Sequence, residues 1–495
     1  MNTGKTEATF TIDRRTLLAG AGAGIAALSA GGAVAQAAPA VRIRRNLSLM
    51  TPTDPWFADY ADAVAAMHEL DEIAPDDRRG WRQQALIHLN HCPHGSIPGF
   101  LPWHRHYLRY YEEICGQLIG KPDFALAYFD WSTNRGQIPA AFYANGPLNV
   151  AFWLDSSNGS SANWAGGRLV RTIGSRQLPQ GRGLLDDPFR GGAFQASAIN
   201  QIKTTRNYDV FERGVEGSPH NIAHGLIGGG VGHMGDGMSP LDPIFWCHHC
   251  NVDRLWAEWQ NLGNISTPQE LIYDDMFVDA NGDSVSTTSL AALNTRTFDS
   301  NGDPVGFDYD TLDAIGLFAS LIRTESSATR PPPKPSLIGQ SDDGEALANR
   351  PTNFPVELDE LDAAIESSIS VPKSIGRSAP AADEFNRLVA RFKGVRGVDG
   401  GENLIANVFV NCPYLSPETP YVDPHFAGSF AFFMTHGMHP QEFLVDITET
   451  VATLATMGRI DPDVLDIQIM PISLKDGSPV DQAKLEVGSV DILRV

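Results

Sequence analysis

The chain has few cysteines, a shortage of basic residues and no long apolar run, and each shortage excludes a class of protein. Its 495 residues include five cysteines, an odd number that argues against a disulfide framework. Lys and Arg number 37 against 59 Asp and Glu, and the formal net charge of −22 argues against nucleic acid or an anionic membrane surface as a partner. This charge carries no information about a small aromatic substrate.

The apolar stretch near the N-terminus is short and rich in glycine, unlike the roughly 20 apolar residues of a membrane span. Arg14 and Arg15 precede this stretch, and Ala35-Gln36-Ala37 offers a small-x-small cleavage site. Residues 1–37 therefore resemble a twin-arginine signal, a route that carries folded proteins. We expect an exported protein, periplasmic or secreted, with an uncleaved N-terminal anchor as the alternative.

The rest of the chain divides by periodicity and composition into parts of different kinds. It is long enough for two or three domains, and its 42% hydrophobic content is ordinary for a globular protein. Residues 38–262 show helical periodicity, 263–330 lose it, and 331–352 read as a linker rich in Pro and Ser. Residues 353–495 contain strand-like segments separated by turns. The predicted class is α+β: a mainly helical domain followed by an all-β sandwich or barrel.

Ten of the fourteen histidines lie in two short windows, which is the strongest indication of function in the sequence. They occupy positions 88, 91, 94, 104 and 106, and 220, 224, 233, 248 and 249. Each window can supply three imidazoles, so the economical interpretation is two metal ions with three nitrogen ligands each.

Imidazole suits Zn, Cu, Fe and Ni, and the pattern narrows this choice. A di-iron bundle would need Glu-x-x-His pairs, which neither window contains. A catalytic zinc site would leave the second trio unused. Two all-nitrogen sites fit a pair of coppers, and structural histidines or another metal stay open as alternatives.

Local features place these histidines on helices. Ser218 and Pro219 predict an N-cap and first helical position, so His220 and His224 fall at i and i+4 on one face, the spacing for two ligands of one ion. Cys247 and Cys250 form a C-x-x-C around His248-His249, but no second C-x-x-C completes a zinc site. We interpret them as small buried thiols.

Three strings carry a family resemblance: "FLPWHRHYLRYYE", "HNIAH" and "SPLDPIFWCHHCNVDRLW". They are similar to the copper motifs of the tyrosinases, catechol oxidases and plant-type polyphenol oxidases. "FALAYFDWSTNRGQIP" and "DPHFAGSFAFFM" extend the similarity beyond the motifs. The likeness is strong over about 85–260, moderate over about 400–495 and weak between.

The resemblance implies a dicopper four-helix-bundle catalytic domain over 38–262, with two copper ions as the cofactor. The first copper would be held by His88, His94 and His104, and the second by His220, His224 and His249. His248 would line the site, where family members can contact substrate. The remaining clustered histidines are assigned to supporting, surface or loop roles: His91, His106 and His233.

Cys92-Pro93-His94 is similar to the Cys-x-His in which some family members join sulfur to imidazole, so a Cys92–His94 thioether is implied. One departure concerns the first copper. The family usually has eight residues between its second and third ligands, and here nine lie between His94 and His104. A loop can absorb one residue, and His91 is the fallback ligand.

The implied activity is oxidation of o-diphenols to o-quinones with dioxygen, with a small phenolic substrate and no nucleic-acid or membrane partner. Glu216 and Asn221 resemble the Glu/Asn pair credited with holding an activating water, so hydroxylation of monophenols (tyrosinase activity, a monooxygenase reaction) is a further expectation. An o-aminophenol oxidase and a haemocyanin-like oxygen-binding protein are the alternatives.

The resemblance also implies that the C-terminal β domain, residues 353–495, covers the active site. Candidate cuts for its release lie in the linker and near 374–382. Asp253, four residues after His249, is expected to anchor its helix through an ion pair. The physiological phenol and the oligomeric state are not encoded in any recognisable pattern.

Overall fold

The protein is described from a computed structural model, whose described residues are 41–95, 97–154, 176–229, 232–298, 304–312, 334–358, 387–433, 439–460, 464–474 and 481–495. The N-terminal signal, the first three residues of the expected linker (331–333) and the second candidate cut lie outside these ranges. Among the described residues, none of the helices combines the length and the apolar character needed to cross a bilayer.

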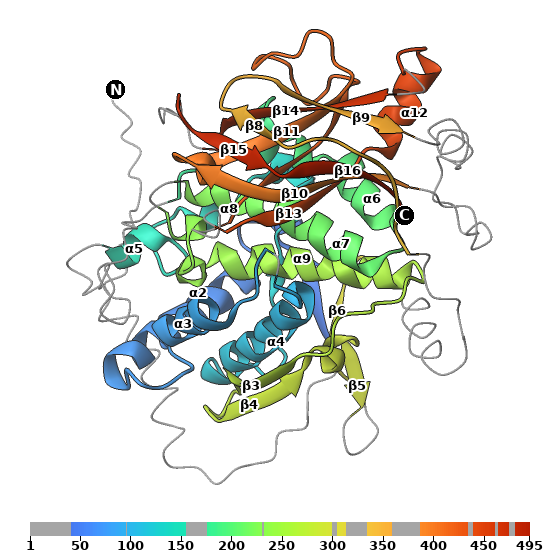
Figure 1. The fold of residues 1–495 in the computed structure, drawn as a ribbon. Helices are drawn as coiled ribbons and strands as arrows, with labels where there is room; N and C mark the ends of the chain where they lie inside the picture. The colour runs from blue at the N-terminus through green and yellow to red at the C-terminus, as the bar shows by residue number, and fades with distance from the viewer. Residues whose placement is uncertain are drawn as a thin grey trace, which may run out of the picture.

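Helices form one side of the molecule and a large antiparallel sheet covers the other (Figure 1). The helices that carry or support the histidine windows are α2 (Pro55–Ile73), α3 (Trp81–His91), α4 (Phe100–Leu118), α8 (Asn221–Gly228) and α9 (Ile244–Asn261). Three further helices lie nearby: α5 (Val150–Leu154), α6 (Ala196–Thr204) and α7 (Tyr208–Val215).

Aromatic side chains hold α4 against α9. The rings of Tyr111 and Trp246 stack with centroids 3.3 Å apart, and Tyr107 lies 4.7 Å from Trp246. All three side chains are buried, and such ring pairs contribute stability beyond the apolar area that they bury. This packing fixes the helix that carries His104 relative to the helix that carries His249.

The expected helix start at Ser218 is wrong, because α7 continues into α8 through a π-helical turn, Glu216–His220. Pro219 lies inside this turn and has no N–H to donate. A wider turn accommodates the proline without ending the helix, and such turns are frequent at functional sites. Glu216 and His220 are thereby held on one continuous helical segment.

A small sheet ties the start of the described chain to its middle segment. The strand β1 (Arg42–Asn46) pairs in parallel with β2 (Ala127–Tyr128) and with β6 (Pro304–Tyr309), which pairs with β5 (Arg296–Phe298). Arg44 is fully buried here and donates to Glu112, Asp253 and the Tyr309 hydroxyl. The hairpin of β3 (Ile272–Val278) and β4 (Ser284–Thr288) lies beside α4 (Figure 1).

The C-terminal sheet has the strand order β12-β11-β14-β9-β7-β16-β10-β15-β8, with β13 paired to β10. Its strands are β7 (Ser336–Gln340), β8 (Gly344–Leu347), β9 (Thr352–Leu358), β10 (Leu388–Val398), β11 (Leu404–Val410), β12 (Phe426–Ala431), β13 (Gln441–Asp446), β14 (Val464–Ser473), β15 (Lys484–Val487) and β16 (Ser489–Arg494), and helix α12 (Thr448–Thr456) accompanies them. β7 and β8 fall within the expected linker, so that boundary is wrong: their backbone groups complete the sheet. The sheet has its own buried apolar core.

Candidate metal centre

The two histidine windows converge into two buried clusters that could each hold a metal ion. One contains His88, Cys92, His94 and His104, and the other contains His220, His224, His248 and His249. Within each cluster the ligand atoms all lie within 4.8 Å of one another. The clusters adjoin, because the rings of His104 and His249 stack with centroids 4.0 Å apart.

Hydrogen bonds to the outer ring nitrogen orient three of these imidazoles. The Nδ1 atoms of His88, His104 and His224 lie 2.9, 2.8 and 2.7 Å from the carbonyl oxygens of Gly237, Phe100 and Met234. A carbonyl oxygen can only accept, so each Nδ1 carries the proton and each Nε2 keeps its lone pair for a metal.

His220 is oriented by a relay that ends in the C-terminal sheet. The Asn221 amide nitrogen donates to the Ala431 carbonyl oxygen at 2.7 Å, which turns the Asn221 Oδ1 towards His220. The His220 Nδ1 lies 2.8 Å from that oxygen and therefore donates to it. Its Nε2 has no hydrogen-bond partner among the described residues and is free to bind a metal.

Burial keeps these imidazoles neutral, the form in which histidine binds metals. Burial lowers the pKa of His220 to about 3, and it lowers the pKa of His104, His224 and His249 well below the ordinary value. Neutral nitrogen donors in two trios, with no carboxylate among them, fit a pair of copper ions better than hard cations.

His94 comes from the loop between α3 and α4 and is buried, whereas the alternative ligand His91 is exposed on α3. The His94 ring lies 5.6 Å from that of His88 and 5.8 Å from that of His104. The additional loop residue therefore leaves His94 within the first cluster; Ser96 in this loop lies outside the described residues.

Glu216 lies beside His94 rather than in solvent. Its Oε1 accepts from the Gly95 backbone N–H at 2.6 Å and lies 3.4 Å from the His94 Nδ1. Burial raises the pKa of this carboxyl to about 8, an effect that the Gly95 hydrogen bond partly opposes. A perturbed carboxyl beside a cluster that could hold a metal ion is a candidate proton acceptor.

Cys92 lies among the ligands of the first cluster. Its Sγ is 3.1 Å from the His94 Nε2 and 3.3 Å from the His104 Nε2. Burial raises the pKa of the thiol well above its usual value. By contrast, Cys247 and Cys250 are buried free thiols on α9, and they are absent from both clusters.

The remaining singled-out residues have structural contacts. The His106 Nε2 lies 2.9 Å from the Thr288 carbonyl oxygen, and His233 is buried in a short 3-10 helix instead of an open loop. Asp253 accepts from Arg44 and Arg105, so it anchors α9 through buried ion pairs.

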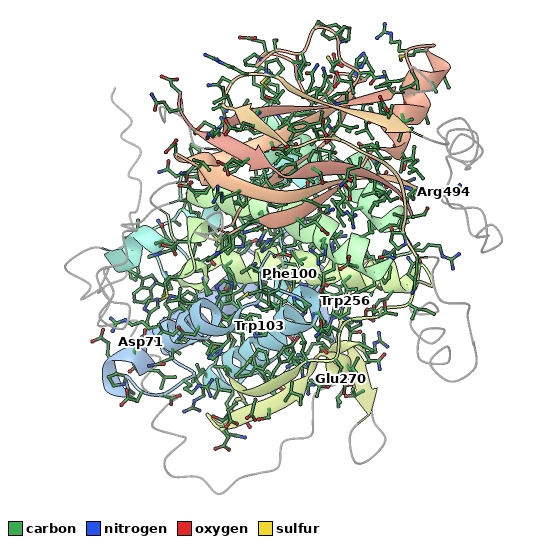
Figure 2. The ribbon with its side chains drawn as sticks, in the orientation of Figure 1. Asp71, Phe100, Trp103, Trp256, Glu270 and Arg494 are labelled. Atoms are coloured by element: carbon green, nitrogen blue, oxygen red, sulfur yellow. The ribbon has the colours of Figure 1, made fainter. Side chains whose placement is uncertain are left out.

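Phe433, from the C-terminal part of the chain, lies over both clusters and was not predicted from the sequence. Its ring centroid is 4.0 Å from that of His224 and 4.8 Å from that of His94. The aromatic walls of the site include Phe100 and Phe245, within 5 Å of His220 and His249 respectively. Phe100 and the nearby Trp103 lie in the interior of the molecule (Figure 2).

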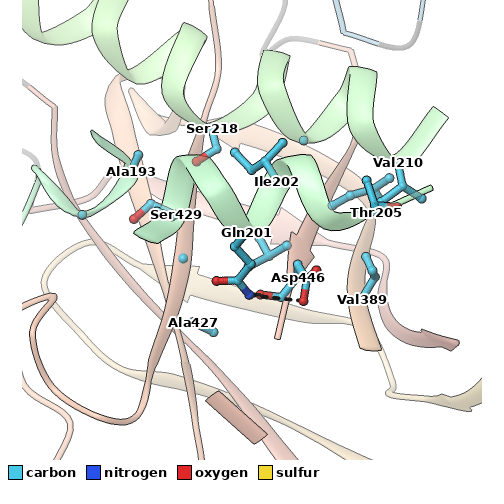
Figure 3. Close-up of a pocket in the computed structure, with 16 residues that line it drawn as sticks. Ala193, Gln201, Ile202, Thr205, Val210, Ser218, Val389, Ala427, Ser429 and Asp446 are labelled. Atoms are coloured by element: carbon cyan, nitrogen blue, oxygen red, sulfur yellow. Dashed lines mark hydrogen bonds between the residues drawn. The ribbon is translucent and has the colours of Figure 1, made fainter. Parts of the chain in front are cut away.

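Glycines of the helical part make room for side chains of the C-terminal sheet. A Cβ atom on Gly192 would lie 2.6 Å from the Phe426 ring, and one on Gly217 would lie 2.9 Å from the Phe443 ring. Beside these contacts, α6, α7 and the sheet border a small pocket, where the Gln201 amide donates to Asp446 at 3.2 Å (Figure 3).

Two adjoining, buried clusters of histidines with aromatic side chains around them are the kind of site found in dinuclear copper proteins. Residues 59–262 match the family model described as the common central domain of tyrosinase.

Curated relatives include enzymes from plants and a bacterium. The chain is 25% identical over 478 residues to polyphenol oxidase D of Solanum lycopersicum, covering 87% of this chain and 75% of the relative. It is 24% identical over 494 residues to a tyrosinase of Hahella sp. (strain CCB-MM4), and the alignment covers 92% of this chain and 95% of the relative. The alignment with polyphenol oxidase C of Solanum lycopersicum, at 29% identity, spans only 45% of that relative and 51% of this chain.

Among solved structures, latent apple tyrosinase has a TM-score of 0.58 at 19% identity, covering 93% of this chain and 98% of the other. Latent aurone synthase, a polyphenol oxidase, has a TM-score of 0.58 at 21% identity, covering 93% and 90%. At such identities the similarity establishes the fold: a helical core with a C-terminal β domain.

Proposed function

We propose that this protein is a type-3 copper phenol oxidase that converts o-diphenols to o-quinones. The observation that carries the proposal is the pair of buried clusters, which contain three and four imidazoles. His88, His94 and His104 would hold one copper, and His220, His224 and His249 the other. When bound, the copper pair supplies the redox chemistry that moves four electrons from two diphenols to dioxygen, giving two quinones and two waters.

The protein itself contributes oriented imidazoles and apolar surroundings. Backbone carbonyls hold the rings of His88, His104 and His224, so these ligands need not reorganise when a metal binds. Phe100 and Phe245 are buried against the imidazoles and give the site apolar walls. An aromatic ring of a phenol is compatible with such walls.

The test is to load the purified, metal-free protein with copper without oxygen, and then to add oxygen. We expect two coppers per chain, a new near-ultraviolet band and catechol turnover after limited proteolysis. The band without turnover would indicate an oxygen carrier, and preferred turnover of o-aminophenol an aminophenol oxidase. Two bound coppers with neither signal would contradict the ligand assignment.

Hydroxylation of monophenols is a further part of the proposal, with Glu216 as the proton acceptor and Asn221 as its partner in holding water. A cationic metal nearby would favour the ionised carboxylate that this role needs. Glu216 is buried, and its contact with His94 places it at the edge of the site.

Replacing Asn221 by Gly is therefore expected to lower monophenol turnover roughly tenfold or more, because general-base assistance is worth at least this much. Turnover of catechol, which is more acidic, should fall less. Both rates are measured on protease-treated, copper-loaded protein, and Asn221→Asp serves as the variant that keeps an oxygen beside the His220 Nδ1. Equal losses for both substrates would contradict the assignment.

A thioether between Cys92 and His94 is also proposed, on the basis of their 3.1 Å approach. Forming this sulfur–carbon bond removes two hydrogens, whose electrons would pass to dioxygen through the copper site. The peptide that contains both residues should then be lighter by two hydrogens in mass spectra and resist thiol alkylation. An alkylated, full-mass peptide from copper-loaded protein would exclude the bond.

We further propose that the intact chain is latent, with a catalytic part over 38–262, a middle segment over 263–330 and a C-terminal part that closes the site through Phe433. Two solved relatives are described as latent forms, which supports this view. Export in the folded state through the twin-arginine-like segment, residues 1–37, completes the proposal. Detection of a mature chain outside the cytoplasm, lost on replacing Arg14 and Arg15 by Lys, would test the export.

A further inference from the structure

The second cluster contains four imidazoles, although three suffice for one copper. His220, His224, His248 and His249 are all fully buried, and their ligand atoms lie within the same 4.8 Å. Proximity therefore does not distinguish His248 from the three assigned ligands. What distinguishes His248 is the hydrogen-bond partner of its Nδ1 atom.

The His248 Nδ1 faces a donor, unlike the Nδ1 atoms of His88, His104, His220 and His224. The Trp131 indole Nε1 lies 3.1 Å from it, and both side chains are buried. An indole N–H can only donate, so the His248 Nδ1 must accept. The proton of the neutral ring is then on Nε2, which has no lone pair left for a metal.

The indole is held firmly in this position. Trp131 lies three residues after the end of β2. In the segment between them, the backbone N–H of Phe129 donates to the carbonyl oxygen of Cys247 at 2.8 Å, and Cys247 is the residue before His248. The Trp131 ring packs edge-on against Phe194, with centroids 6.2 Å apart. The short segment between β2 and Trp131 is thus tied to the helix that carries His248.

We propose that Trp131 is a positioning residue that fixes His248 in the tautomer with hydrogen on Nε2, so that His248 donates a hydrogen bond into the site and does not bind copper. The His248 Nε2 has no acceptor among the described residues. The ligand class that fits this donor is an anionic oxygen, such as that of a phenolate, at the second metal. This role rests on the proposed function, whereas the tautomer does not.

The tautomer is tested by nitrogen NMR of metal-free protein labelled with ¹⁵N-histidine, with the His248 signals assigned through His248→Gln. We expect a protonated Nε2 and an unprotonated Nδ1 in the wild type. Trp131→Phe keeps an aromatic ring against Phe194 but removes the donor, and should give a mixture of tautomers. A protonated Nδ1 in the wild type, or no change in Trp131→Phe, would overturn the inference.

Trp103→Phe is the matched control, since Trp103 is also buried beside a cluster histidine but its indole nitrogen has no partner among the described residues. It should leave the His248 signals unchanged. In copper-loaded, protease-treated protein, Trp131→Phe is expected to raise KM for catechol about twofold at unchanged copper content, because an even mixture of tautomers leaves the donor form in about half of the molecules. An unchanged KM would overturn the role as a substrate donor.

Because the tautomer is measured without metal, failure to bind copper or to turn over catechol would count against the proposed function alone. The converse also holds. A catalytically active, dicopper protein whose His248 carries its proton on Nδ1 would leave the proposed function intact and remove Trp131 from it.

Discussion

Phe433 shows how one side chain can connect the two parts of the chain. It is almost fully buried, and it packs against histidines of both clusters, where a phenol ring would have to lie. Burying a phenylalanine stabilises the closed arrangement by about 2 kcal/mol. In the proposed latent chain, this one contact would therefore account for a substantial part of the equilibrium between the closed and the open form.

Replacing Phe433 by Ala should raise catechol turnover of the uncut, copper-loaded chain roughly tenfold or more, because each 1.4 kcal/mol changes an equilibrium tenfold. Protease-treated protein should show no such gain. Tyr414→Ala removes an exposed aromatic side chain from the same domain and should change neither rate. A Phe433→Ala chain that stays as inactive as the wild type would show that other contacts close the site.

For single residues, the sequence predicted which residues form the site better than it predicted their hydrogen-bond partners. Motif and spacing identified the histidines that converge, Cys92 beside His94, and Asp253 in an ion pair. The contacts of Trp131 with His248 and of Asn221 with Ala431 join residues 117 and 210 positions apart. Local patterns carry no information on such distances, so these partners had to come from the structure.

Glycines determine how closely the helices and the C-terminal sheet approach each other. Gly192 has room for its hydrogen only, since a Cβ atom would lie 2.9 Å from the Tyr421 Cβ as well as 2.6 Å from the Phe426 ring. Tyr421 also joins this interface through its backbone N–H, which donates to the Pro188 carbonyl oxygen at 3.0 Å. The contact therefore has little freedom to adjust.

Gly192→Ala is expected to weaken docking by about 1–3 kcal/mol, the usual cost of overpacking, and so to raise turnover of the uncut chain about five- to a hundredfold. The rate of the protease-treated form should not change, because Gly192 does not contact the clusters. Gly146→Ala is the control, as nothing lies within 4 Å of a Cβ there. Equal activity of the uncut Gly192→Ala and wild-type chains would argue that the interface tolerates the methyl group.

Elements with strong periodicity were predicted well, and those that depend on context were not. The helices around His104 and His249 follow from their amphipathic patterns. The π turn at Glu216–His220 was missed because Ser-Pro normally starts a helix. The strands β7 and β8 were missed because short, polar segments become strands only when a sheet edge accepts them.

Stability of the whole molecule should depend on pH through buried carboxyls such as Glu212. Glu212 accepts from the Leu101 backbone N–H and the Tyr208 hydroxyl, and burial raises its pKa to about 7. The unfolded value is about 4.3, so the stabilisation of the protonated form is complete below pH 4.3 and is lost as the pH rises through 7.

Glu212→Gln should therefore become more stable relative to the wild type between about pH 4.3 and 7, by about 4 kcal/mol in total, since each pKa unit corresponds to about 1.4 kcal/mol. Denaturant unfolding at several pH values measures this difference. Glu258→Gln should change in the opposite direction and become less stable relative to the wild type as the pH rises. Burial alone would raise the pKa of Glu258, but Arg254 and Lys203 lower it below its ordinary value. Parallel pH profiles for wild type and Glu212→Gln would contradict the assignment.

The parallel pairing of β1 with β6 determines the order in which the chain can fold during synthesis. Arg44 completes its buried contacts only with Glu112, Asp253 and Tyr309, the last of them 265 residues further along the chain. Until Tyr309 has left the ribosome, β1 cannot pair with β6, and Arg44 lacks the Tyr309 hydroxyl as a hydrogen-bond acceptor. Strand β1 can therefore complete its pairing only after all the helices that carry the two histidine clusters have been made.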